Sequence, residues 1–214
     1  MYIQITSRCN MTCAHCCYEC GPAGVDMPLA MFDKAMNVGL ELGHPCVAIG
    51  GGEPTVHPRF WSIVQRARAF AAKHGTRRVW LATNGKRTAD ALRLADMTRR
   101  GELAATLSLD DYHEPIAEAV VEAFSEIDHF AVRSIRTSTV FASGRAKAWG
   151  ADECINPCPH VAPDGTIYGC GCRATVWGSL WDYAVSDDVR RCAWHTGGRA
   201  ACDSRKREAI CAER

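Results

Sequence analysis

The sequence predicts a mixed α/β protein, a partial (β/α)5-6 TIM-type barrel with a small cysteine-rich C-terminal extension. Up to Val140, short apolar runs alternate with longer amphipathic stretches, and the joins between them are short and polar. This alternation is typical of a parallel sheet with helical crossovers. About five strands of this kind are too few to close an eight-stranded barrel, so we expect the barrel to be open. After about Ser143 the alternation ends and cysteines become frequent.

The predicted elements follow one another in a regular strand–helix order. The strand candidates are residues 1–6, 46–53, 78–85, 104–110 and 130–140. The helix candidates are residues 27–43, 58–75, 88–101 and 115–127. The first helix illustrates the pattern, because its apolar residues recur at helical intervals between Pro28, which suits a first turn, and Gly43, a common stop.

We divide the chain into a barrel domain, residues 1–143, and an extension, residues 144–214. In the extension, "CPHVAPDGTIYGCGC" predicts a hairpin with Asp164 and Gly165 at its turn. From Ser186 the tail is charged and carries further cysteines. Because the extension is poor in apolar residues, we expect it to need a metal or the main domain in order to fold.

The composition is that of a globular protein, with 47% hydrophobic and 23% charged residues among 214. No apolar run is long enough to span a membrane, and the first residues lack the basic and apolar regions of a secretory signal. We therefore expect a cytoplasmic protein without a membrane partner. In a reducing cytosol, the odd number of cysteines, 13, favours metal or cluster ligation over a disulfide framework.

Five cysteines lie between Cys9 and Cys20, which is the densest cysteine stretch of the chain. The polar residues among them leave no apolar face to bury, so a purely structural core role is excluded. Disulfides, zinc, an iron–sulfur cluster and a redox pair remain alternatives at this point. The stretch directly follows the first predicted strand, and parallel α/β folds place their active sites at such strand ends.

Cys9, Cys13 and Cys16 have a C-x3-C-x2-C spacing that resembles the signature of the radical S-adenosylmethionine (SAM) superfamily. "GGGEPT" ends the second predicted strand, as the superfamily's Gly-Gly-Glu motif does, while "TNG" and "SLDDYHE" end the third and fourth. The resemblance covers residues 1 to about 140. It implies that the three cysteines hold a 4Fe–4S cluster and leave one iron open for SAM. In that superfamily, a low-potential electron then cleaves SAM to a 5′-deoxyadenosyl radical, which abstracts hydrogen from a substrate.

The resemblance also implies how the methionine end of SAM is bound. Gly51 and Gly52 would let the backbone approach it closely, and the region of Glu53 would face its ammonium group. Taken alone, the two glycines would favour a strand-to-helix turn, and Glu53 a charge at a helix N-terminus.

The nucleoside end of SAM would be bound by the later strand ends. The resemblance implies that Ser108 and Asp110 hydrogen-bond the ribose hydroxyls, that Tyr18 stacks near the adenine, and that Asn84 borders the same pocket. His113 is interpreted as a structural hydrogen-bonding group rather than a proton shuttle.

The segment from Cys158 to Cys170 resembles the start of the SPASM and twitch extensions of radical SAM enzymes, and "GRA" at Gly144–Ala146 resembles the turn that often precedes them. Such extensions hold auxiliary 4Fe–4S clusters. The later cysteines lack the spacing of a full SPASM domain, so we expect at most one auxiliary cluster, with structural zinc or no metal as alternatives. Cys17 and Cys20 are either spectators or approach that site. The ligands implied for the auxiliary cluster are Cys158, Cys170, Cys172 and Cys192.

The segment from Arg59 to Arg100 is strongly basic, with eleven lysines and arginines against Asp90 and Asp96. One interpretation is two solvated helix faces. The other is a docking surface for an acidic electron donor such as flavodoxin or ferredoxin, with nucleic acid as a less favoured partner. The residues expected to form this basic face are Arg66, Arg68, Lys73, Arg77, Arg78, Arg93, Arg99 and Arg100.

The sequence therefore predicts a radical SAM enzyme. SPASM-like extensions often accompany peptide or protein modification, so we expect a maturase-like reaction on a peptide or protein. A small molecule or modified nucleobase is the alternative substrate. A non-catalytic iron–sulfur or zinc redox module is the alternative class, and it is disfavoured because it would not need SAM-binding motifs at successive strand ends.

Overall fold

The computed structural model describes residues 1–44, 46–75, 78–127, 131–133, 143–147, 159–169, 171, 173 and 176–182. Within these residues the strands form one sheet in the order β5-β4-β3-β2-β1-β6-β7-β8. The sheet is open, because β5 and β8 stand at opposite ends of this order. The predicted α/β class with an open barrel is confirmed.

The first six strands of the sheet are parallel. They are β1 (Tyr2–Gln4), β2 (Cys46–Gly50), β3 (Arg78–Thr83), β4 (Ala104–Ser108), β5 (Val132–Arg133) and β6 (His160–Val161). The connecting helices are α1 (Leu29–Glu41), the short 3-10 helix η1 (Pro54–Val56), α2 (Phe60–His74), α3 (Thr88–Arg99) and α4 (Glu118–Ser125). Because the strands run in the same direction, the segments after β1, β2, β3 and β4 all leave from the same edge of the sheet.

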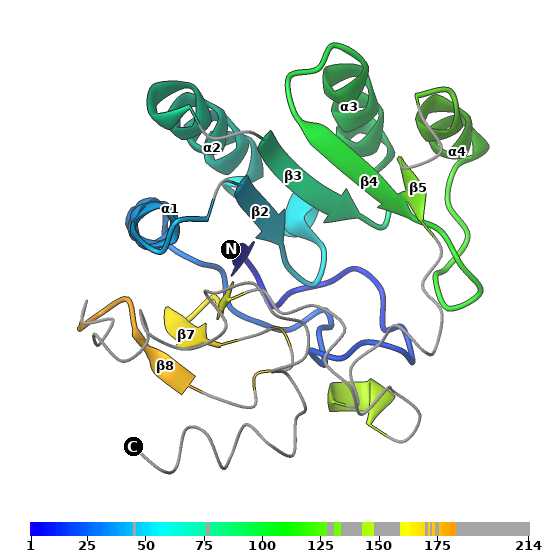
Figure 1. Ribbon diagram of the computed structural model, residues 1–214. Helices are drawn as coiled ribbons and strands as arrows, with labels where there is room; N and C mark the ends of the chain where they lie inside the picture. Colours follow the sequence, from blue (N-terminus) through cyan, green and yellow to red (C-terminus); the bar gives the residue numbers. More distant parts are fainter. Residues whose placement is uncertain are drawn as a thin grey trace, which may run out of the picture.

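The hydrophobic core lies between the helices and the sheet. Figure 1 shows helices α1 to α4 gathered on one side of the sheet, with the segment after β1 on the other side. Apolar side chains on neighbouring strands and on the inner faces of the helices are almost completely buried. The largest of these include Ile3, Ile49, Leu81 and Leu107 from the strands, and Phe32, Ile63, Leu94 and Phe124 from the helices.

The predicted C-terminal hairpin is present and continues the main sheet. Its second strand, β7 (Thr166–Tyr168), pairs antiparallel with β6 and with β8 (Val176–Ser179). The turn has the predicted residues, and the backbone N–H of Thr166 donates to Asp164 Oδ1 at 2.9 Å. Sequence analysis did not predict that β6 would pair parallel with β1. The division of the chain at residue 143 stays a prediction.

Some predicted elements differ in extent from those observed. The helix expected over residues 58–75 begins only at Phe60, after η1. Of the strand expected over residues 130–140, the structure describes β5, and residues 134–140 lie outside the described part. The four cysteines predicted to hold an auxiliary cluster, Cys158, Cys170, Cys172 and Cys192, also lie outside it.

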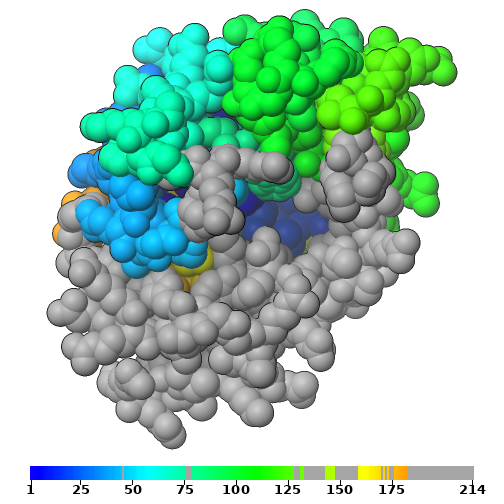
Figure 2. Space-filling view, turned by 45° about the horizontal axis from the view of Figure 1, so that its top comes forward, coloured from blue at the N-terminus to red at the C-terminus, as the bar shows by residue number. Residues whose placement is uncertain are grey.

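The basic segment is partly neutralised by the fold. Figure 2 shows α2 and α3, which carry most of this segment, at the outer surface of the molecule. Several of its arginines pair with acidic residues that lie outside the segment: Arg66 with Asp33, Arg68 with Glu102 at 2.8 Å, and Arg99 with Glu126 at 3.6 Å. The charge counted along the sequence therefore overestimates the charge that this surface presents. Arg77 and the side chain of Arg78 are outside the described part.

Across the described residues, we find no helix with the length and apolar character needed to cross a membrane.

Candidate functional site

The three cysteines of the C-x3-C-x2-C motif lie on one loop, between β1 and α1, at the C-terminal end of the barrel strands. Cys9, Cys13 and Cys16 are free thiols and half-buried. The loop turns back on itself, because the N–H of Cys9 donates to the carbonyl of Gly21 at 2.6 Å and the N–H of Cys16 donates to that of Cys13 at 3.2 Å. The predicted position at the end of the first strand is therefore correct. We call residues 9–20 the cysteine loop.

The thiols of this loop are close enough to influence one another's ionisation. Burial raises the pKa of Cys9 to about 11, and the neighbouring Glu53, Cys13 and Cys16 contribute in the same direction. Burial, followed by the charge of Cys16, also raises the pKa of Cys13. Because each thiolate disfavours the next, the three are ionised together only beside a compensating cation. Three soft sulfur ligands that need such a cation fit an iron–sulfur cluster.

Cys17 and Cys20 are the other two cysteines of the loop and are not part of the C-x3-C-x2-C motif. Cys20 is buried, its N–H donates to Cys16 Sγ at 3.4 Å, and its sulfur accepts from Gln4 Nε2 at 3.5 Å. The hydrogen bond from Cys20 is the largest cause that lowers the pKa of Cys16 to about 6, while the pKa of Cys20 is raised. Burial raises the pKa of Cys17 to about 12. Both extra cysteines are therefore held as neutral thiols.

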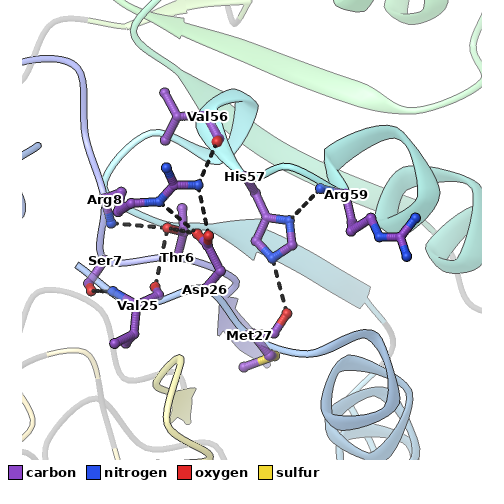
Figure 3. A network of polar contacts seen from close by, with 9 residues as sticks. All are labelled: Thr6, Ser7, Arg8, Val25, Asp26, Met27, Val56, His57 and Arg59. Atoms are coloured by element: carbon purple, nitrogen blue, oxygen red, sulfur yellow. Dashed lines mark hydrogen bonds and ion pairs between the residues drawn. The ribbon is translucent and has the colours of Figure 1, made fainter. Parts of the chain in front are cut away.

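A polar network holds the start of the cysteine loop against the segment before α1 (Figure 3). Arg8 forms a two-pronged ion pair with Asp26, with Nε 3.1 Å from Oδ1 and Nη2 2.7 Å from Oδ2. The same Nη2 donates to the carbonyl of Val56, at the end of η1, at 3.0 Å. Thr6 Oγ1 donates to Asp26 Oδ1 at 2.7 Å. Arg8, the residue before Cys9, thus binds both the segment before α1, through Asp26, and the end of η1, through Val56.

His57 extends this network toward α2 (Figure 3). Its Nδ1 accepts from the N–H of Arg59 at 2.9 Å, so Nε2 carries the proton and donates to the carbonyl of Met27 at 3.0 Å. Burial lowers the pKa of His57, and both ring nitrogens are used by the neutral form. The imidazole therefore joins the end of η1 to the start of α1 as a neutral group.

The two glycines after β2 allow a close approach between protein segments. The N–H of Gly52 donates to the carbonyl of Thr6 at 2.9 Å, and the N–H of Glu53 donates to that of Arg8 at 3.0 Å. A Cβ added to Gly52 would lie 2.4 Å from the carbonyl oxygen of Arg8, and one added to Gly51 would lie 3.0 Å from that of Thr6. The glycines were predicted to bring the backbone close to SAM; the approach that the structure shows is to the backbone preceding Cys9.

Glu53 is almost completely buried, and both of its carboxylate oxygens accept hydrogen bonds from the protein. Oε1 accepts from the N–H of Thr55 at 3.1 Å, from Thr55 Oγ1 at 2.7 Å and from Thr83 Oγ1 at 2.9 Å. Oε2 accepts from the N–H of Asn84 at 2.7 Å. Burial raises the pKa of Glu53, and these hydrogen bonds oppose that shift. The side chain thus joins the ends of β2 and β3, and that the region of Glu53 faces the ammonium group of SAM stays a prediction.

Asn84 connects the end of β3 to the cysteine loop. Its Nδ2 lies 3.9 Å from Cys9 Sγ and donates to Asn10 Oδ1 at 2.9 Å, while its Oδ1 accepts from the N–H of Lys86 at 3.0 Å. Asn84 therefore lies against the cysteine loop, with Glu53 accepting from its backbone N–H, and that it borders the adenine pocket stays a prediction.

The segment after β4 contacts the cysteine loop through tilted and edge-to-face ring contacts. Ser108, the last residue of β4, is buried, and Asp110 Oδ1 accepts from the N–H of Tyr112 at 2.9 Å and contacts His113 Nδ1 at 2.8 Å. His15 packs on Tyr112 and His113, with ring centroids 4.9 and 5.0 Å away. His113 forms the expected structural hydrogen bond, and His15 brings Asp110 next to the cysteine loop.

Tyr18 lies on the other side of the loop, against the C-terminal hairpin. Its ring centroid is 6.4 Å from that of Tyr2 and 5.0 Å from that of His160. The guanidinium of Arg173 lies over the ring at 4.5 Å, and it also donates to Gln4 on β1. This packing argues against the predicted stacking of Tyr18 on adenine, because the ring already contacts β1 and the hairpin.

The structure thus brings most of the predicted site residues to one end of the barrel. The residues at this end are Cys9, Cys13, Cys16, Gly51, Gly52, Glu53, Asn84, Ser108 and Asp110. Sequence analysis missed the groups that hold these residues in place. They are Thr55 and Thr83 around Glu53, the Arg8–Asp26 pair, and Arg145, which lies in the quoted "GRA" but received no role. No periodic signal in the sequence identifies such partners.

Curated proteins resemble the first part of this chain. A GTP 3′,8-cyclase from Streptomyces coelicolor is 29% identical over 137 residues, which cover 56% of this chain and 39% of that protein. A tungsten-containing aldehyde ferredoxin oxidoreductase cofactor-modifying protein from Pyrococcus furiosus is 34% identical over 129 residues, covering 56% of this chain and 33% of that protein. The chain therefore spans well under half the length of these curated relatives.

Solved structures share the fold at low sequence identity. The crystal structure of BtrN in complex with AdoMet and 2-DOIA matches with a TM-score of 0.64 and 15% identity, covering 95% of this chain and 86% of that one. Native anSMEcpe with bound AdoMet matches with a TM-score of 0.59 and 13% identity, covering 91% of this chain and 81% of that one. At these identities the matches show the fold alone.

A family model places the site in a superfamily. The model is described as the Radical SAM superfamily and matches residues 3–128, more than half of the 214 residues. The cofactors of this superfamily are a 4Fe–4S cluster and SAM, and the three thiols at the end of β1 fit the cluster. The chain belongs to the Radical SAM superfamily of enzymes.

Proposed function

We propose that this protein cleaves SAM reductively at a 4Fe–4S cluster and abstracts hydrogen from a small-molecule substrate. The observation that carries this proposal is the cysteine loop, whose three free, half-buried thiols stand where β1 ends and beside the ends of β2 and β3. Three protein ligands leave one iron of a 4Fe–4S cluster open.

Cys9, Cys13 and Cys16 would hold the cluster. When bound together, the cluster and SAM supply the one-electron cleavage that yields methionine and the 5′-deoxyadenosyl radical. The protein's own part is to keep the loop in one conformation: Arg8 fixes its start, and Asn84 donates toward Cys9 Sγ from the end of β3. A donor near a ligating sulfur helps to set the potential of the cluster.

The SAM-binding residues are proposed from the resemblance to the superfamily. Backbone groups of Gly51 and Gly52 would bind the methionine end, and Ser108 and Asp110 would accept hydrogen bonds from the ribose hydroxyls. Glu53 would act as a positioning residue, because its carboxylate is already used within the protein. It holds Asn84 and the Gly-Gly turn in register at neighbouring strand ends.

The proposed substrate class is a small molecule. This choice is supported by the curated relatives, whose names refer to GTP and to a protein that modifies a cofactor. The peptide substrate expected from the SPASM-like pattern has no support of this kind. Residues 144–214 are proposed as a separate extension, and an auxiliary cluster held by Cys158, Cys170, Cys172 and Cys192 remains a proposal outside the described residues.

A one-electron donor such as flavodoxin or ferredoxin is the proposed partner. Ion pairs that balance the arginines of α2 and α3 weaken the case for a long-range electrostatic docking face on these helices. A non-catalytic redox module remains the alternative class. It is disfavoured by the buried hydrogen bonds that hold Glu53 and Asn84 beside Cys9, since a module of that kind has no need of a SAM pocket.

The proposed function is tested with anaerobically reconstituted protein reduced by dithionite. We expect the wild type to convert SAM to 5′-deoxyadenosine, and the C9A/C13A/C16A variant to lose this activity. C46A is the matched control, because Cys46 lies at the opposite, N-terminal end of β2. Undiminished turnover by the triple variant, or no turnover by a wild type that holds a cluster, would contradict the proposal.

A further inference from the structure

Arg145 contacts the cysteine loop at three carbonyl groups, although it lies far from that loop in the sequence. It belongs to a short 3-10 helix, η3 (Gly144–Ala146). Its backbone N–H donates to the carbonyl of Cys16 at 3.0 Å. Its side chain donates from Nε to the carbonyl of Cys13 at 2.9 Å and from Nη2 to that of Cys20 at 2.8 Å.

The residues beside Arg145 are shaped for this contact. Gly144 has a φ of +54°, and a Cβ added to it would lie 2.7 Å from the carbonyl oxygen of Cys17 and 2.8 Å from that of Cys16. Ser143 Oγ donates to the same Cys17 carbonyl at 3.0 Å. Only glycine tolerates both this backbone conformation and this proximity, so η3 is fitted closely to the loop.

The guanidinium adds a fixed positive charge to these hydrogen bonds. A guanidinium is planar and always protonated, so its donors hold two carbonyls at once without losing their charge. Two of the three carbonyls belong to residues whose thiols are proposed as cluster ligands, and Arg145 is half-buried, which weakens screening by solvent. Reduction adds negative charge to a cluster, so a cation beside it favours the reduced form.

We propose that Arg145 is a positioning residue that fixes the cysteine loop and raises the reduction potential of the cluster held there. The proposal rests on the proposed function, since it requires a cluster on Cys9, Cys13 and Cys16. It assigns to the segment after the barrel a part in electron uptake by that cluster.

Two variants of Arg145 and two neighbouring controls test this. R145Q removes the charge, whereas R145K keeps it and loses part of the hydrogen bonding. S143A removes one loop hydrogen bond without changing charge, and K147Q removes an exposed charge two positions further on. The midpoint potential of the reconstituted cluster is measured by EPR-monitored redox titration. Hydrogen exchange of the loop amides is measured on the metal-free protein.

At the wild-type midpoint, we expect R145Q to lower the ratio of reduced to oxidised cluster about tenfold, which is a shift of about 59 mV for a one-electron couple. R145K and K147Q should stay within about twofold of the wild type, because the local charge is kept in one and the lost charge is exposed in the other. S143A should speed exchange in the loop but leave the potential unchanged. R145Q should speed the same exchange more strongly.

A purely structural role would change exchange and stability but not the potential, so an unchanged midpoint in R145Q overturns the inference. An equal shift in K147Q overturns it as well, since the effect would then be one of general charge. If R145Q does not fold, R145K decides, and a tenfold shift there contradicts the proposal. A wild type without any cluster refutes the proposed function, whereas a normal cluster with an insensitive potential refutes only the role of Arg145.

Discussion

Replacing Glu53 with glutamine tests the account of how the strand ends are held together. Each carboxylate oxygen of Glu53 accepts from a backbone N–H: Oε1 from Thr55 at 3.1 Å and Oε2 from Asn84 at 2.7 Å. The amide group of a glutamine therefore meets one of these N–H groups whichever way it is turned. E53Q must leave one buried backbone donor without an acceptor.

The expected loss of stability follows from this one unsatisfied donor. An unsatisfied buried donor costs about 1–3 kcal/mol, and the remaining hydrogen bonds lose the assistance of the charge. Burial raises the pKa of Glu53, which shows that the folded protein also bears a penalty for this charge, and glutamine relieves it. We therefore expect a net destabilisation of about 2 kcal/mol, or roughly 4–8 °C in Tm for a chain of this size.

The assay is urea unfolding of the metal-free protein, with hydrogen exchange at the Asn84 amide as a local measurement. T55V is the matched control, because it removes the hydroxyl that donates to Oε1 at 2.7 Å but keeps the backbone donors paired. It should cost about 1 kcal/mol. If E53Q unfolds within about 0.5 kcal/mol of the wild type, or the Asn84 amide exchanges at the wild-type rate, Glu53 does not hold these strand ends together.

Two further predictions concern the neighbouring segments. G52A should destabilise the protein by about 2–3 kcal/mol in the same urea assay, because its Cβ would lie 2.4 Å from the carbonyl oxygen of Arg8. G21A is the control: its Cβ would lie 4.0 Å from Thr12, so it should change stability much less. Burial lowers the pKa of His57, so below the ordinary histidine pKa of 6.5 the unfolded chain binds a proton that the folded protein does not. The free energy of unfolding should therefore decrease as the pH is lowered from about 7 to 5. H57Q should reduce this pH dependence, and an unchanged pH dependence in H57Q would show that other groups cause it.

Features that depend on local sequence were predicted well. The cysteine spacing and the order of strands and helices are local patterns, and parallel strands bring their C-terminal ends to one edge, so the neighbourhood of Cys9, Glu53 and Asn84 could be inferred. The orientation of Glu53 could not, because the hydroxyl of Thr83 and the N–H of Asn84 lie about thirty residues further along the chain. Only the folded structure shows that they meet the carboxylate.

Charge and aromatic contacts were predicted less well for the same reason. The basic character of α2 and α3 was counted along the chain, but Arg66 and Arg68 meet Asp33 and Glu102, which lie outside that segment. Tyr18 was placed by its position beside the motif cysteines. Its ring is instead covered by Arg173, from beyond the predicted hairpin turn.

The central claim of this account is that one iron of the 4Fe–4S cluster has no protein ligand and is open to SAM. Mössbauer spectroscopy of the ⁵⁷Fe-reconstituted protein tests this claim most directly. Cys9, Cys13 and Cys16 are proposed as the ligands, while Cys17 and Cys20 are held as neutral thiols. We predict that adding SAM changes the spectrum of one iron in four in the C17A/C20A variant as it does in the wild type, and that C9A/C13A/C16A loses this response. If SAM leaves all four irons alike in the wild type and perturbs one only when Cys17 and Cys20 are removed, a fourth cysteine ligates the cluster and the account is wrong.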